Sequence, residues 1–88
     1  MSVSRDDLRL WVFEALKALG GKAYLIDVAD HIWTHHEADL RTNRTRLLKW
    51  QYEMRWGATQ LRKQGYMKEN TTSEPWELTA KGMGAASL

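Results

Sequence analysis

One stretch of this chain, residues 50–82, constrains the fold more than any other. It starts inside a long amphipathic pattern, WQYEMRWGATQLRKQ, whose apolar residues recur at helical spacing until Gly65. Two short strand-like pieces follow at 66–69 and 76–79, and a polar segment, residues 70–75, separates them. This order predicts a helix that ends at a glycine, followed by an antiparallel β-hairpin.

The N-terminal part of the chain predicts another amphipathic helix. A capping box at residues 4–7, Ser-x-x-Asp, opens it, and the glycine pair at 20–21 ends it. Its core face is expected to consist of Leu8, Trp11, Val12, Ala15 and Leu19. Leu10 and Phe13 project from the opposite side, so we expect the C-terminal segment, a partner domain or a second copy to cover them.

A second helix is expected from Ile26 to about His35, after a short extended piece at residues 22–25. The segment HEADLRTN, residues 36–43, has no hydrophobic periodicity and is predicted to be a polar loop. Such a loop is longer than the turn of a minimal helix-turn-helix.

The third helix is predicted to begin near Arg44, with Thr42 or Asn43 as its N-cap. Helical spacing gives this helix two different faces. Its buried face is expected to hold Leu47, Trp50, Met54, Gly57, Ala58 and Leu61. The opposite face carries aromatic and cationic residues, namely Lys49, Tyr52, Trp56, Thr59 and Lys63.

These elements outline a winged helix-turn-helix. A chain of 88 residues is long enough for one hydrophobic core, so we predict a single domain over residues 1–88. The predicted fold class is α+β and mainly α, with three helices plus a C-terminal β-hairpin that forms the wing.

The charge of the chain is distributed unevenly. Residues 41–68 contain eight basic residues and one acidic residue, a net charge of +7. The flanking segments are acidic, with net charges of −3 over residues 1–40 and −2 over residues 69–88. A basic block between acidic flanks is typical of an element that faces phosphates, although an ordinary solvated helix face can have the same composition.

We therefore expect the third helix to enter the major groove of duplex DNA, where its N-terminal half reaches base edges. The residues expected to read DNA there are Asn43, Arg44, Thr45, Arg46, Lys49 and Tyr52. Arginine suits guanine because its planar fork donates to both O6 and N7. The expected phosphate contacts are Lys22, Arg41, Arg55, Lys63 and Lys68. The wing tip would add the hydrogen-bonding side chains of Asn70, Thr71, Thr72 and Ser73.

Two interpretations of the outward aromatic residues remain open at the level of the sequence. In the first, the wing folds back over Trp56, with Trp76 as its neighbour. In the second, Tyr52 or Trp56 forms an apolar contact with a base, for example with a methyl group in the major groove. Trp33, at the end of the second helix, is a third candidate for such a pocket.

Other chemistries find little support in the sequence. His31 and His35 have the i,i+4 spacing of metal ligands and His36 adjoins them, but Glu37 and Asp39 are the only further candidates, so no metal site is expected. The chain has no cysteine, no phosphate-binding glycine loop and no nucleophile elbow, so we expect neither catalytic residues nor a cofactor. No apolar run approaches a membrane span, and the expected location is the cytoplasm, with the nucleoid.

Three short motifs resemble the N-terminal winged-helix domain of Mrr-type restriction proteins. They are Arg55-Trp56-Gly57, Leu61-Arg62-Lys63-Gln64-Gly65 and Trp76-Glu77-Leu78-Thr79-Ala80-Lys81-Gly82. The similarity covers roughly residues 8–82. The chain departs from the family at Gly57, where alanine is usual, and its 88 residues do not include the nuclease domain that normally follows.

The resemblance implies a DNA-binding module of a restriction system, with a fused or partner nuclease or a homodimer as its context. Related winged helices in modification-dependent restriction enzymes recognise adenine methylated on its exocyclic amine. The resemblance therefore also implies a pocket for a methylated base, for which Trp33, Tyr52 and Trp56 are the candidates. The alternatives are a winged helix that mediates protein interaction or dimerisation, and a transcriptional regulator that reads no modified base.

Overall fold

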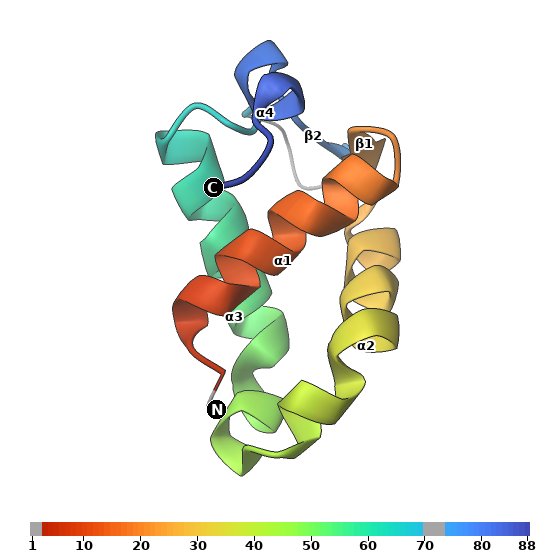
Figure 1. Ribbon diagram of the computed structural model, residues 1–88, viewed down its shortest axis with the longest axis vertical. Coiled ribbons are helices and arrows are strands. Elements are labelled where there is room, and N and C mark those ends of the chain that lie inside the picture. Colours follow the sequence, from red (N-terminus) through yellow and green to blue (C-terminus); the bar gives the residue numbers. More distant parts are fainter. Residues whose placement is uncertain (1–2, 70–73) are drawn as a thin grey trace.

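The computed structural model describes residues 3–69 and 74–88 of the chain. Its helices and strands follow one another as α1 (Arg5–Ala18), β1 (Lys22–Ala23), α2 (Leu25–Arg41), α3 (Arg44–Lys63), β2 (Trp76–Glu77) and α4 (Ala80–Gly84). The first helix crosses in front of α3, and α2 and α3 diverge from a shared turn at one end of the molecule (Figure 1). The two short strands and α4 lie at the other end.

The expected start and end of α1 are confirmed. Ser4 and Asp7 form the capping box, and the two glycines after the helix have φ angles of +89° and +94°. The expected core face needs one correction, because Leu19 is 40% exposed and Leu16 is fully buried. Leu19 is the C-cap residue, so its backbone has left the helix and no longer follows helical spacing.

The expectation that another part of the structure covers Phe13 is confirmed, since its side chain is only 3% exposed. Tyr66 meets the Phe13 ring edge-on, with 6.3 Å between ring centroids. Lys17 lies over the same ring and binds the carbonyl oxygens of Met83 and Ala85. Of the three coverings considered above, the C-terminal segment is therefore the one that lies on this side of α1.

The polar loop predicted at residues 36–43 is also wrong, because α2 continues through Arg41. Leu40 is completely buried, and His36 stacks on the ring of Trp11 with 3.8 Å between ring centroids. Glu37 and Arg41 form an i,i+4 ion pair of 2.7 Å on the same stretch. One buried residue, Leu40, and one half-buried residue, His36, are too few among polar residues to produce a hydrophobic period, so the sequence resembled a loop.

The expected hairpin is present in a reduced form. Strands β1 and β2 pair antiparallel, with Lys22 opposite Glu77 and Ala23 opposite Trp76. On the other edge of β2, the expected strand at 66–69 contributes an isolated bridge from Met67 to Leu78. Two backbone hydrogen bonds, Lys68 N–H to the Glu77 carbonyl at 2.9 Å and Thr79 N–H to the Tyr66 carbonyl at 3.0 Å, flank that bridge.

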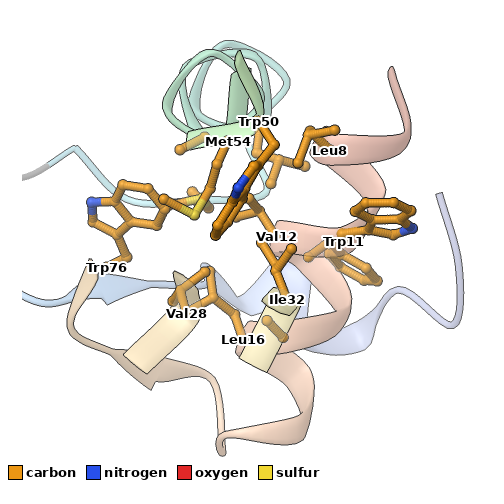
Figure 2. Close-up of a cluster of buried hydrophobic side chains, with 14 of the residues drawn as sticks. Leu8, Trp11, Val12, Leu16, Val28, Ile32, Trp50, Met54 and Trp76 are labelled. Atoms are coloured by element: carbon orange, nitrogen blue, oxygen red, sulfur yellow. The ribbon is translucent and has the colours of Figure 1, made fainter. Parts of the chain in front are cut away.

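The hydrophobic core lies where α1 crosses α2 and α3. Side chains from these helices and from β2 converge there, among them Leu8, Val12, Ile32, Met54 and Trp76 (Figure 2). The result is a mainly helical α+β fold with a small antiparallel sheet, an arrangement compatible with a winged helix. Within the described residues, no helix combines the length and apolar character that crossing a membrane requires.

Candidate nucleic-acid interface

Helix α3 has one buried face and one exposed face, as its sequence predicted. Trp50, Met54, Gly57, Ala58 and Leu61 are buried against the other helices, and Leu47 is half-buried. On the opposite side a continuous exposed stripe runs the length of the helix at three- and four-residue spacing. Its members are Thr45, Leu48, Tyr52, Arg55, Thr59 and Lys63.

The N-terminal end of α3 is held by the predicted cap. The side-chain oxygen of Asn43 accepts a hydrogen bond of 3.2 Å from the backbone N–H of Arg46. The carboxamide of Asn43 is therefore occupied by the helix. Arg44 and Thr45, the first two residues of the helix, are exposed.

The expectation that Arg46 reads bases requires a correction. Its guanidinium binds the carboxylate of Glu53 two turns along the helix, and its Nε donates to the carbonyl oxygen of Val3 at 3.1 Å. The exposed fractions of the two side chains are 17% for Arg46 and 7% for Glu53. The sequence interpretation missed Glu53, although its i,i+7 spacing from Arg46 places both on one side of the helix.

Four cations of α3 are exposed, namely Arg44, Lys49, Arg55 and Lys63. Within the described part of the chain, none of these four side chains has an ion pair or a hydrogen bond to a protein group. Lys22 on β1 is exposed in the same way. These five residues are cations whose charges the protein leaves available to a partner.

Two other expected phosphate contacts are engaged within the protein. Arg41 binds Glu37 and lies over the ring of Trp33, 5.2 Å from its centroid. Lys68 binds Glu77 at 3.1 Å across the sheet. The predicted wing residues, Asn70, Thr71, Thr72 and Ser73, lie outside the described residues.

The three candidate aromatic residues do not form one pocket. The ring of Trp33 stacks on that of Trp50, with 5.9 Å between their centroids, between α2 and α3. Tyr52 is 74% exposed on the outer face of α3. Trp56 is half-buried and lies beneath the guanidinium of Arg5, the first residue of α1, 4.2 Å from the ring centroid.

A shallow groove runs between α2 and α3 and consists of two adjoining concavities of about 420 and 390 Å³. The first is lined by Leu25, Ile26, Ala29, Gln51, Tyr52, Met54 and Arg55. The second shares Ala29 and Gln51 with it and adds Asp30, Trp33, Leu47 and Trp50. Ile26, which lines the first concavity, and Leu48, on the exposed stripe of α3, are each 73% exposed, and the sequence interpretation assigned neither of them to a binding surface.

The histidines of α2 have ordinary protein surroundings. His31 and His35 lie side by side, with ring centroids 4.1 Å apart. The pKa of His31 is lowered from its ordinary value of 6.5, first because burial disfavours the charged form, and then because His35 and His36 are near. Among the residues that the structure describes, no group of three or more His, Cys, Asp or Glu side chains is placed to hold a metal ion.

Comparison of the chain with protein-family models, with curated proteins and with solved structures gave no match. The geometry of the exposed face of α3 is therefore the main basis on which a function can be argued.

Proposed function

We propose that this protein binds duplex DNA by placing the exposed face of α3 in the major groove. An α-helix has the dimensions of that groove, and in helix-turn-helix proteins the helix after the turn enters it. Here α2 and α3 are joined by two residues, Thr42 and Asn43, so the sequence presents two helices separated by a tight turn. The pairing of β1 with β2, with Met67 bridged beyond it, supports a wing next to this unit.

The charge pattern of α3 is the single observation that carries the proposal. Arg44, Lys49, Arg55 and Lys63 stand exposed and unpaired within the described chain, whereas the one acid of the helix, Glu53, is buried and bound to Arg46. A row of cations without an internal counter-charge suits a polyanion, whose phosphates would release their counterions on binding.

In this proposal the protein is a binding module and not an enzyme, and it acts on the nucleoid. Its motifs resemble those of Mrr-type domains, so a targeting role in a restriction system is the biological context that we propose. Recognition of adenine methylated on its exocyclic amine stays a prediction from that resemblance. The separation of Trp56 from Trp33 and Tyr52 means that any such pocket would have to be built from the groove between α2 and α3.

The test is duplex binding by a variant in which Arg44, Lys49, Arg55 and Lys63 are all changed to glutamine. Four phosphate contacts predict a salt slope of about −3.6, which corresponds to about a 150-fold loss of affinity between 50 and 200 mM salt. The variant should lose both the affinity and most of this slope. As a control away from the exposed face of α3, Lys17→Gln removes one positive charge from a side chain that binds the C-terminal segment, and its effect should be much smaller than a quarter of that of the fourfold variant.

Undiminished binding by the fourfold variant would refute the assignment of α3. A panel of plain and adenine-methylated duplexes, measured with the unchanged protein, tests the modification separately. Equal affinities across that panel would remove methyladenine recognition and leave DNA binding in place.

A protein-interaction role is the second candidate, because Ile26, Leu48 and Tyr52 are each more than 70% exposed on or beside the same face. Large exposed apolar side chains in one region mark interfaces. This alternative predicts association that survives high salt, and it predicts no measurable affinity for duplex DNA. Sedimentation in 0.05 and about 0.5 M salt, with and without a duplex, separates the two functions.

A further inference from the structure

We propose that Leu48 and Tyr52 read the C5-methyl groups of pyrimidines in the major groove. The inference rests on the proposed binding of duplex DNA by α3 and names the chemical group that this helix would recognise. The phosphates would then be bound by the flanking cations, and the sequence preference would come from apolar contacts.

The two side chains occupy the centre of the exposed stripe of α3. Leu48 is 73% exposed and Tyr52 is 74% exposed, and Thr45 precedes them by one turn on the same stripe. A rise of about 1.5 Å per residue places Leu48 and Tyr52 about 6 Å apart along the helix axis. Adjacent base pairs are separated by about 3.4 Å, so the two side chains can address neighbouring steps of one site.

The positions of the cations indicate which kind of partner faces Leu48 and Tyr52 at the centre of the exposed stripe. Arg44 and Lys49 lie toward the start of the helix, and Arg55 and Lys63 lie toward its end. All four are exposed and unpaired among the described residues, which favours a polyanion over an apolar protein surface as the occupant. With the cations on the backbone, Leu48 and Tyr52 are the residues of the exposed stripe that remain for the base edges in the middle of the helix.

Among the four unmodified bases, only thymine displays an apolar group in the major groove, the methyl at C5. Cytosine presents the same group when it is methylated at C5. The concavity beside Tyr52, about 420 Å³ and lined by Ile26 and Met54 among others, gives an apolar surface against which a protruding methyl group can pack. The shared chemistry of both sources is therefore a pyrimidine C5-methyl group.

The experiment starts from duplexes selected by the unchanged protein from a random library. Each selected sequence is then made in three forms: with thymine, with uracil in place of thymine, and with 5-methylcytosine in place of cytosine. Loss of one contacted methyl should weaken binding about fourfold, and loss of two about fifteenfold. Changing both Leu48 and Tyr52 to alanine should abolish these ratios while the salt slope stays, because the cations remain.

Weaker binding of the uracil form supports the proposal with thymine as the source of the methyl. Unchanged binding of the uracil form together with tighter binding of the 5-methylcytosine form supports it with the modified base as the source. No response to either replacement, in a protein that still binds duplexes in a salt-dependent way, overturns this inference and leaves the proposed function standing. Absence of duplex binding overturns both.

A control variant separates this contact from general surface effects. Leu19→Ala removes an exposed apolar side chain from the C-cap of α1, away from the exposed face of α3. It should keep the uracil and 5-methylcytosine ratios of the unchanged protein. Equal loss of the ratios in Leu19→Ala and in the double variant would overturn the assignment to Leu48 and Tyr52.

Discussion

Arg46 and Glu53 show how one buried carboxylate redirects a side chain. The sequence interpretation took Arg46 for a base reader because it lies in the first turn of a basic helix. In the structure its guanidinium binds Glu53 and the carbonyl oxygen of Val3, so it joins the N-terminal segment to α3. The second carboxylate oxygen of Glu53 is buried and has no hydrogen-bond partner among the described residues.

Changing Glu53 to alanine should lower the free energy of unfolding by about 3 kcal/mol, because it leaves the Arg46 guanidinium half-buried without its counter-charge. Replacing both residues, as Arg46→Met with Glu53→Leu, should restore most of that loss, since it also removes the unpartnered oxygen. Urea denaturation measures both variants.

The double variant also tests the corrected role of Arg46. Its affinity for duplex DNA should equal that of the unchanged protein. A loss of affinity in a variant that is folded and stable would return Arg46 to the set of DNA-binding residues.

His31 predicts a pH dependence of stability. Its pKa in the folded protein lies below 6.5 because of burial first, and then because of His35 and His36, while Glu14 and Asp30 act in the opposite direction. The unfolded chain therefore binds a proton more readily than the folded one, and the unfolding free energy falls as the pH drops through 6.5. At pH values well above 6.5 His31 is neutral in both the folded and the unfolded chain, so it no longer makes the free energy of unfolding depend on pH.

The measurement is urea denaturation at several pH values between about 5 and 8. His31→Gln should flatten the decline between neutral and mildly acidic pH. A His31→Gln variant with an unchanged pH profile would contradict this assignment.

At the scale of the elements, the crossing of α1 over α3 depends on a glycine. A Cβ at Gly57 would lie 2.8 Å from the Cα of Arg9 and 2.9 Å from its backbone nitrogen. These are backbone atoms of another helix, so no flexible side chain can move away to make room. An alanine at this position therefore does not fit this packing.

Gly57→Ala should lower the free energy of unfolding by about 1–3 kcal/mol, because overpacking separates the two helices. Alanine is a better helix former than glycine by about 1 kcal/mol. The sign of the change in the free energy of unfolding therefore shows whether overpacking or helix propensity is the larger effect. Gly84→Ala in α4 is the control, since a Cβ there meets no atom within 4 Å. Calorimetry or urea denaturation gives both values, and a stabilised Gly57→Ala variant would refute the close approach.

At the scale of the whole molecule, the net charge is only +2, because the acidic residues of α2 offset part of the positive charge of α3. Asp30 of α2 is exposed and lines the groove beside α3. If DNA lies against α3, this carboxylate repels phosphates at the edge of the interface. Asp30 would then lower the affinity for duplexes of any sequence, while the cations of α3 remain available to phosphates.

Asp30→Asn should raise the affinity for duplex DNA by about two- to fivefold at low salt. The gain should vanish near about 0.5 M salt, because screening removes the effect of an exposed charge. Asp6→Asn, in the first turn of α1, is the control with the same change of net charge. Equal gains in both variants would show that overall charge, and not the position of Asp30, sets the affinity.

The sequence alone was sufficient for the features that arise from local periodicity and local hydrogen bonds. The capping box at Ser4, the N-cap at Asn43 and the two faces of α3 depend on residues within a few positions of one another. These interactions are the same in any fold that contains the helix, so their patterns could be recognised without it.

The tertiary structure decided which side chains are available to a partner. Glu53 binds the guanidinium of Arg46, and Arg5 of another helix lies over the ring of Trp56. Helix α2 is longer than expected because Leu40 is buried in the common core. Such contacts join residues that are distant in the chain, or depend on how helices cross, and no local pattern reports them. The sequence thus determined the helices and their charge by short-range chemistry, whereas only the packing of one helix on another determined which charges and rings stay exposed.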